Sequence, residues 1–278
     1  MKTNDPAIRA TGLCLGRDAT TILHDITLDI PAGSVVGLVG RNGAGKSSLL
    51  RCLAGLTEPT RGSSTLLGCP STSLTDAVRE RLGYVAQTPD LFDWMQADEM
   101  LATIGRAYPR WSQERVNGLC RQLDLRTDRA IRDMSGGDQQ KLAVVLALAH
   151  DPELLLLDEP VASLDPLSRR EFMRALFGAD DQGERTIVIS SHILTDLERV
   201  VSHVAFLRAG RLQLFEAWDT LLEHYRLQPP GARGIPHDAV VSTATLTGNR
   251  VVDMRLAADG ADAGHPLTLD DLFVELNP

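Results

Sequence analysis

Residues Gly40 to Ser47 read Gly-Arg-Asn-Gly-Ala-Gly-Lys-Ser, and this stretch decides the fold. It matches the phosphate-binding pattern G-x-x-x-x-G-K-[ST] in full. An apolar run at 34–39 precedes it, and residues 48–53 follow with helical spacing. Because a strand and a helix flank the loop, we expect its backbone N–H groups and the helix start to surround phosphate oxygens. The alternative, a glycine-rich turn that binds nothing, does not explain this strand-and-helix context.

Two side chains of this loop bring further chemistry. Lys46 adds a full positive charge for the outer phosphates, and the hydroxyl of Ser47 suits a Mg²⁺ ion. The loop therefore predicts a nucleotide site with Mg²⁺. Its candidate cofactor-binding residues are Gly40, Arg41, Asn42, Gly43, Ala44, Gly45, Lys46, Ser47 and Ser48.

The composition narrows the class of protein. The chain has 278 residues with 43% hydrophobic residues, ample for a core, and a net charge of −9, which argues against a dedicated nucleic-acid binder. The four cysteines are scattered and form no metal or disulfide pattern. Neither a secretory signal nor an apolar stretch long enough to span a bilayer is seen. We expect a soluble cytoplasmic protein that needs another polypeptide for any membrane step.

Strands and helices alternate along the chain, which predicts a doubly wound α/β core. Residues 7–30 suggest strands with a turn near Gly16, and 82–86, 154–157 and 186–189 read as further strands. From 98 to 125 the apolar spacing is helical. Residues 204–207 and 211–215 flank Ala209-Gly210 as a hairpin. We place the main domain at 1–228, and after a Pro/Gly linker a small α+β extension at 229–278, with strands in 239–256 and a helix capped by Thr268.

Two adjacent carboxylates, Asp158 and Glu159, follow the apolar run 154–157. In an open α/β sheet the ligand sits beside the carboxyl ends of the strands. Asp158 would then face the same Mg²⁺ as Ser47, while Glu159 would hold an attacking water and accept its proton. A solvated acidic turn before Pro160 is the alternative, and the phosphate-binding loop upstream makes it the weaker one.

A second glycine-rich helix start lies at Ser135-Gly136-Gly137-Asp138. A hydroxyl beside bare N–H groups at a helix N-terminus suits an anion, but by itself an ordinary N-cap is the better interpretation. The order of the motifs decides otherwise. Gln87 at a strand end, the Ser135 helix start, Asp158-Glu159, Ser163-Leu164-Asp165 and His192 after a strand follow one another along the chain.

This order resembles the ATP-binding-cassette (ABC) ATPases over about residues 8–222. The resemblance implies a P-loop NTPase core with an N-terminal β subdomain and an inserted helical subdomain at about 88–151. It implies that ATP and Mg²⁺ are the ligands, that Glu159 and His192 are catalytic, and that Ser47, Gln87 and Asp158 serve the metal. The other residues that it places at the nucleotide are Ser135, Gly136, Gly137, Asp138 and Asp165.

The resemblance also implies partners. Two subunits, either a homodimer or this chain with a paralogue, would pair head to tail, so that Ser135-Gly136-Gly137 of one covers the ATP held by Gly40–Ser47 of the other. A separate integral membrane permease would place the protein on the cytoplasmic face of the cell membrane. One departure concerns Asp138, since the family usually has glutamine there, and a carboxylate near a triphosphate would weaken closure unless it faces solvent.

The segments at 108–112 and 133–153 and the tail at 267–273 are similar to bacterial ABC-2-type exporters of the YtrB-like subgroup. We therefore expect an exporter ATPase, with an importer ATPase or a soluble ABC ATPase acting on ribosomes or DNA as alternatives. If the segment 91–95 after Gln87 is a loop, it exposes large apolar side chains, which is typical of a protein contact.

Overall fold

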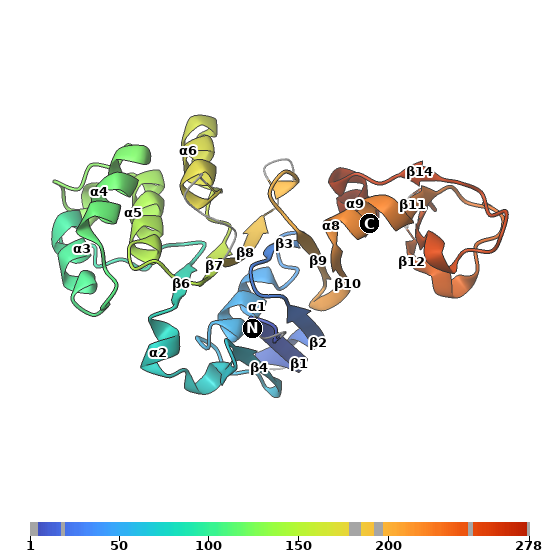
Figure 1. The fold of residues 1–278 in the computed structure, drawn as a ribbon, viewed down its shortest axis with the longest axis horizontal. Coiled ribbons are helices and arrows are strands. Elements are labelled where there is room, and N and C mark those ends of the chain that lie inside the picture. Colours follow the sequence, from blue (N-terminus) through green and yellow to red (C-terminus); the bar gives the residue numbers. More distant parts are fainter. Residues whose placement is uncertain (1–4, 18–19, 178–184, 192–196, 244–246, 277–278) are drawn as a thin grey trace.

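A six-stranded sheet forms the centre of the protein, in a computed structural model that describes residues 5–17, 20–177, 185–191, 197–243 and 247–276 (Figure 1). The strand order is β10-β9-β3-β8-β7-β6. Neighbouring strands are parallel, apart from the antiparallel pair β9 and β10. This confirms the predicted α/β class. The strands are β3 (Val35–Val39), β6 (Leu82–Val85), β7 (Leu154–Asp158), β8 (Thr186–Ser191), β9 (His203–Arg208) and β10 (Arg211–Ala217).

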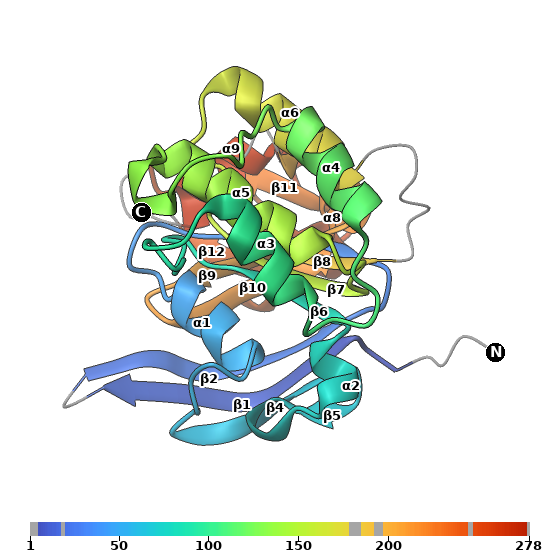
Figure 2. The same cartoon turned by 90° about the vertical axis from the view of Figure 1, so that its left-hand side faces the viewer.

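The apolar run 154–157 is buried because the sheet is covered on both faces. Side chains alternate along a strand, so Leu154 and Leu156 enter one apolar cluster while Leu155 and Leu157 enter the other. The first cluster packs against α1 (Lys46–Leu53) and the N-terminal sheet. The second packs against the remaining long helices. Figure 2 shows the result as layers, with α3, α4, α5 and α6 on one side of the central sheet and α1 on the other.

The N-terminal subdomain is a four-stranded antiparallel sheet in the order β2-β1-β4-β5. The expected strands in 7–30 are confirmed as one long hairpin. Apolar side chains of this sheet, such as Leu13 and Ile26, are fully buried against α1. The strands are β1 (Ile8–Arg17), β2 (Thr20–Ile30), β4 (Arg61–Leu66) and β5 (Cys69–Pro70).

The helical periodicity at 98–125 belongs to two helices, α3 (Ala97–Gly105) and α4 (Gln113–Gln122), which pack against α5 (Gly136–Leu148). Polar side chains set their starts. The hydroxyl of Ser112 accepts a hydrogen bond from the N–H of Arg115 at 3.2 Å, and Gln96 forms a capping box with Glu99. Two further helices of this central region are α2 (Asp76–Arg79) and α6 (Pro166–Phe177), and short 3₁₀ turns lie at Ser71–Ser73 and Ile131–Asp133.

A third sheet, in the order β12-β13-β11-β14, forms the C-terminal part. Its strand β11 begins at Tyr225, directly after α8, so this sheet starts before the boundary predicted at residue 229. The expected cap is present, because the Asp271 N–H donates to the Thr268 hydroxyl at 3.1 Å. The elements are α8 (Trp218–His224), β11 (Tyr225–Gln228), β12 (Val240–Thr243), β13 (Arg250–Asp253), β14 (His265–Pro266) and α9 (Leu269–Leu276), with 3₁₀ turns at His237–Ala239 and Met254–Leu256.

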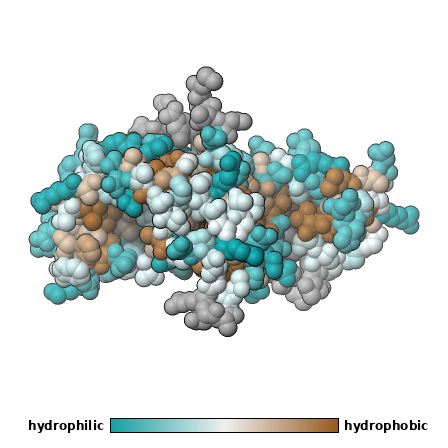
Figure 3. Space-filling view, turned by 90° about the horizontal axis from the view of Figure 1, so that it is seen from below, coloured by the Kyte–Doolittle hydropathy of each residue, from teal (hydrophilic) through white to brown (hydrophobic). Residues whose placement is uncertain are grey.

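The surface mixes hydrophilic and hydrophobic residues, with brown patches toward both ends of the face in Figure 3. Among the exposed large apolar residues, Phe92 and Trp94 stand out because their rings stack with centroids 5.1 Å apart while Trp94 is 71% exposed. Within the ranges described, no helix has the length and apolar character needed to cross a bilayer.

Candidate functional site

The loop after β3 has the backbone shape that its glycines predict. Gly43 and Gly45 have φ of 81° and 104°, in the region that side chains disfavour. Gly40 is required for a different reason, because a Cβ there would lie 2.2 Å from the carbonyl oxygen of Leu207 on the neighbouring strand β9. The loop is therefore fitted tightly to the sheet at Gly40 and curls freely at Gly43, where a Cβ would meet no atom within 4 Å.

Gly40→Ala is expected to destabilise the fold by about 1–3 kcal/mol, the usual cost of overpacking, since the opposing atom is backbone and cannot rotate away. Urea unfolding measures the effect. Gly118→Ala is the matched control, because Gly118 lies within α4 with open space around it and should gain about 0.5–1 kcal/mol from helix propensity. Equal stability of the two variants would contradict the close approach of Gly40 to β9.

Helix α1 starts directly on this loop. Its N-cap is Gly45, with no side-chain cap and no acidic residue in the first turn. The first N–H groups of a helix have no partner within the helix, and its N-terminus carries partial positive charge. The Lys46 ammonium lies at the same place, folded back so that Nζ donates to the carbonyl oxygen of Gly40 at 2.8 Å. The loop thus concentrates positive potential at the carboxyl end of β3.

The two predicted carboxylates lie at the carboxyl end of β7 and are buried, with Asp158 2% and Glu159 4% exposed. Glu159 Oε1 lies 3.2 Å from Lys46 Nζ, so the loop lysine and the second carboxylate form a buried ion pair. Glu159 has φ of 47°, a left-handed conformation that is uncommon for a residue with a side chain. The sequence predicted Lys46 and Glu159 for the site, but it did not predict that the two side chains form an ion pair.

A hydroxyl that sequence reasoning missed joins the two carboxylates. Ser190, near the end of β8, accepts a hydrogen bond from the Glu159 N–H at 2.8 Å and donates one to Asp158 Oδ1 at 2.7 Å. The sequence does carry a signal for it, because Ser190 is a polar residue after the apolar stretch 187–189 of a fully buried strand. The motif order points instead to His192, two residues further on, which lies outside the described residues.

The remaining predicted residues lie elsewhere. Ser135 is the N-cap of α5, and its hydroxyl accepts from the Asp138 N–H at 3.1 Å. Gly136 faces open space, whereas a Cβ on Gly137 would approach the carbonyl oxygen of Ser163 at 3.3 Å. The start of α5 and the segment before Asp165 are therefore neighbours within one chain. Because α5 and α1 pack on opposite faces of the central sheet, the structure does not place Ser135 in the cluster of Lys46 and Glu159.

Asp138, Asp165 and Gln87 have local surroundings that bear on their predicted roles. The Asp138 carboxylate lies 4.0 Å from Lys141 on its own helix, so a cation partly offsets the unusual charge. Asp165 starts α6, and hydrogen bonds from the Ser168 hydroxyl and nearby backbone N–H groups hold its pKa below the usual value. Gln87 follows β6 and is exposed.

The donors present fit a Mg²⁺ ion that is held mainly by its nucleotide. Magnesium at a nucleotide site takes only one or two carboxylates from the protein, together with phosphate oxygens and waters. Asp158 supplies a buried carboxylate, and Ser47 is a partly exposed hydroxyl at the start of α1. In the part of the chain that the structure describes, no group of three or more His, Cys, Asp or Glu residues forms a cage for a metal on its own. The donor set is what a shared nucleotide–metal site requires.

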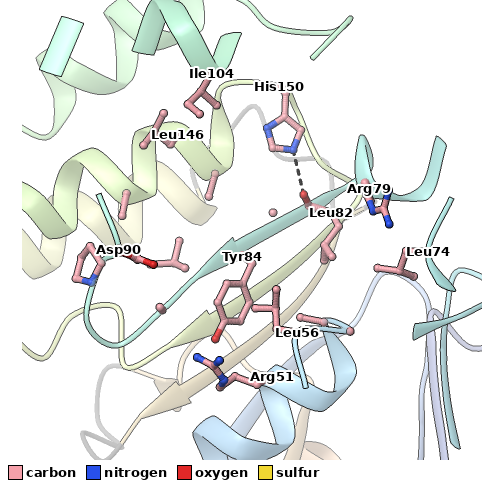
Figure 4. Close-up of a pocket in the computed structure, with 18 of the residues that line it drawn as sticks. Arg51, Leu56, Leu74, Arg79, Leu82, Tyr84, Asp90, Ile104, Leu146 and His150 are labelled. Carbon is pink, nitrogen blue, oxygen red and sulfur yellow. Dashed lines mark hydrogen bonds between the residues drawn. The ribbon is translucent and has the colours of Figure 1, made fainter. Parts of the chain in front are cut away.

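A separate cleft of about 730 Å³ opens between β6, the end of α1 and the helices α3 and α5 (Figure 4). Figure 4 shows the Tyr84 hydroxyl pointing toward Arg51. Burial and then the negative charge of Asp158 raise the pKa of Tyr84, which Arg51 opposes. At the other end the His150 ring stacks on Tyr108 at 4.2 Å, and its Nε2 lies 3.2 Å from the carbonyl oxygen of Leu82. This contact connects His150 in the wall of the cleft to β6, the strand that precedes Gln87.

Known proteins resemble this chain in sequence. The family described as "ABC transporter" matches residues 23–162. A Nod factor export ATP-binding protein I from Cupriavidus metallidurans is 36% identical over 198 residues, which is 68% of this chain and 64% of that protein. The match thus spans less than two thirds of the length of that relative. A methionine import ATP-binding protein, MetN, from Protochlamydia amoebophila is 32% identical over 262 residues, 90% of this chain and 76% of that protein.

Solved structures agree with this relationship. The ATP-binding subunit of an ABC transporter superposes with a TM-score of 0.70 at 28% identity, covering 78% of this chain and 92% of that one. A dimeric post-hydrolysis ATP-binding cassette bound to ADP and Pi shares the fold, with a TM-score of 0.68 at 23% identity over 76% of this chain and 98% of that one. With the phosphate-binding loop, the buried carboxylates and the family match in agreement, this chain belongs to the family of ABC transporter ATP-binding proteins.

Proposed function

We propose that this chain is the ATP-hydrolysing nucleotide-binding subunit of a bacterial ABC transporter that drives a separate membrane permease. The observation that carries the proposal is the buried cluster of Lys46, Asp158 and Glu159 beside a glycine loop with positive φ angles. A lysine and two carboxylates are costly to bury unless their charges are used or paired. At the carboxyl ends of parallel strands they occupy the place where α/β sheets bind ligands.

The residues of the cluster divide the chemistry between them. The loop N–H groups and the start of α1 hold the phosphates of ATP, and Lys46 releases Glu159 to contact the outer ones. Ser47, Gln87 and Asp158 are the groups that would hold Mg²⁺, which when bound supplies positive charge against the β- and γ-phosphates. Glu159 then orients a water and accepts its proton, while His192 contacts the γ-phosphate in the transition state.

A second subunit completes the site in this proposal. Ser135, Gly136 and Gly137 lie on the opposite side of the sheet from α1 in one chain, with Gly136 facing open space. A head-to-tail partner, either the same chain or a paralogue, brings these N–H groups over the ATP. The similar cassette with ADP and Pi is dimeric, which supports this arrangement. Asp138 remains on the helix beside Lys141, which reduces its repulsion of phosphate.

In this proposal the permease docks at the cleft between β6 and the helices α3 and α5. The exposed pair Phe92 and Trp94 follows Gln87 and offers apolar contact area near that cleft. Export is the direction we favour, in line with the Nod factor export relative. Import is a second candidate, because the methionine import relative matches 90% of this chain and so extends into its C-terminal part. The net charge of −9 gives no support to a role on nucleic acid.

Phosphate release from ATP by the purified chain tests the enzymatic part of the proposal. We expect hydrolysis that requires Mg²⁺, disappears in EDTA and rises more than linearly with protein concentration, since two chains build one site. A chain that neither binds nor hydrolyses MgATP would overturn the proposal. Reconstitution in vesicles with the permease that copurifies with the chain then decides the direction of transport, because ATP on one side drives cargo either toward or away from that side.

A further inference from the structure

We propose that Ser190 is a positioning residue that orients the carboxylate of Asp158 and anchors the backbone of Glu159. This inference rests on the proposed roles of Asp158 and Glu159, and it assigns a role to a residue that the motif pattern leaves out. Ser190 touches neither the metal nor the attacking water in this proposal. It acts through the two residues that do.

The topology gives Ser190 its place. Strand β8 lies between β3, which carries the phosphate-binding loop, and β7, which carries the carboxylates. In the register of the sheet, Ser190 is paired with Leu38 on one side and with Asp158 on the other. A side chain at this position is therefore next to both halves of the site and is fixed to them by a continuous parallel sheet.

The hydrogen bonds of Ser190 determine one another. A hydroxyl has one proton to donate and lone pairs to accept. Because the Ser190 oxygen accepts from the Glu159 N–H at 2.8 Å, its proton is directed to Asp158 Oδ1 at 2.7 Å. One side chain thus links the backbone of the proposed base to the carboxylate of the proposed metal ligand.

Burial makes this link hard to replace. Ser190 has no exposed surface, and Asp158 and Glu159 are 2% and 4% exposed, so water does not substitute readily for a lost hydroxyl. Hydrogen bonds to a charged group are stronger in such surroundings, and the cost of leaving a group unpaired is larger. The left-handed backbone of Glu159, with φ of 47°, needs support from its surroundings, and the bond to its N–H provides it.

Two separate effects should follow from removing the hydroxyl. Asp158 would lose the donor that orients it, which weakens the dependence of nucleotide binding on Mg²⁺. Glu159 would lose the anchor of its N–H, which lowers the rate of hydrolysis once nucleotide and metal are bound. The loop and Lys46 are untouched, so nucleotide affinity without metal should stay the same. If the role of Ser190 were purely structural, loss of the hydroxyl would lower the stability of the fold but would change neither the Mg²⁺ dependence of nucleotide binding nor the rate of hydrolysis.

The experiment compares Ser190→Ala with Thr186→Val in the full chain. Thr186 is on the same strand, is also buried, and accepts from the Gly33 N–H at 2.9 Å at the opposite end of the sheet, so its loss is a matched loss of a buried hydroxyl. Calorimetric titration gives ATP affinity in EDTA and at increasing Mg²⁺. Steady-state phosphate release gives the turnover, and urea unfolding gives the stability of each variant.

For Ser190→Ala we expect the Mg²⁺ concentration at half-maximal effect on ATP affinity to rise about 10–100-fold, as for other residues that orient metal ligands, with turnover falling by a similar factor. ATP affinity in EDTA should stay within about twofold, well under the tenfold change that 1.4 kcal/mol would produce. Thr186→Val should keep the wild-type Mg²⁺ dependence and turnover, whatever its stability.

A second pair of variants keeps the test valid if Ser190→Ala folds poorly. Ser190→Thr and Ser190→Val have nearly the same shape and differ in the hydroxyl, so Mg²⁺ dependence should be retained in the first and lost in the second. Equal Mg²⁺ dependence in this pair, or in Ser190→Ala and wild type, would overturn the positioning role while leaving the proposed function intact. Absence of Mg²⁺-dependent ATP binding in the wild-type protein would overturn both.

Discussion

Lys46→Ala is expected to weaken binding of MgATP by at least about tenfold, because a hydrogen bond to a charged group contributes about 1.5–3 kcal/mol and 1.4 kcal/mol corresponds to a factor of ten. Lys46 is 6% exposed and is the first residue of α1, so its charge lies at the buried base of the loop, beside the start of the helix. Calorimetric titration of the folded variant with MgATP measures the loss. Unchanged affinity would contradict the assignment of the loop.

The control for this variant is Lys141→Ala. Lys141 is also largely buried, with 12% of its side chain exposed, but it lies on α5 beside Asp138 and away from the loop. In the single chain, Lys141→Ala should bind MgATP as the wild type does, because Lys141 offsets the charge of Asp138, which meets the nucleotide only where a partner subunit covers it. Lys46→Ala also leaves Glu159 buried without its cation, and breaking a buried pair in this way costs about 3–5 kcal/mol of stability. Adding Glu159→Gln should recover part of that loss, which separates the effect on folding from the effect on nucleotide binding.

Local patterns in the sequence were enough to predict the parts of the site that are continuous in the chain. The loop at 40–47 and the carboxylates after 154–157 each carry their own context, a buried strand before and a turn or helix after. Because parallel strands end at the same edge of a sheet, finding both motifs also predicted that they meet. The ion pair of Lys46 and Glu159 agrees with that expectation.

Local patterns could not predict contacts between strands that are distant in the sequence. Ser190 faces Asp158 only because β8 enters between β3 and β7, and strand order is a property of the whole fold. The early start of the third sheet at Tyr225 has a similar origin, since β11 finds its partner β13 well after the Pro/Gly segment. The sequence also did not show that a residue predicted for the nucleotide site has a structural role of its own. The carboxylate of Asp165 caps α6 in the isolated chain.

The position of Glu159 in the isolated chain makes it a sensitive probe of the mechanism. Its carboxylate is paired with Lys46, so nucleotide must take over the lysine before Glu159 is available to a water. Glu159 directly follows β7, a strand of four leucines that ends in Asp158, and a neutral amide of the same shape causes little disturbance in this buried place. Loss of the charge alone, with the packing retained, therefore reports on proton acceptance.

Glu159→Gln should lower the turnover of ATP by about 10²–10⁴-fold, the usual contribution of a positioned general base, while MgATP binding stays at least as tight as in the wild type. Binding of MgATP is not weakened, because the substitution removes the Glu159 charge that competes with the phosphates for Lys46. Unhydrolysed ATP should then hold two chains together, so size-exclusion chromatography with MgATP should show dimers that persist.

Glu153→Gln is the matched control, since Glu153 precedes the same strand at its other end and pairs with Arg81 on the surface at 2.6 Å. It should hydrolyse ATP normally. Wild-type turnover in Glu159→Gln would remove that residue from the role of base, and the buried pair would then serve stability alone.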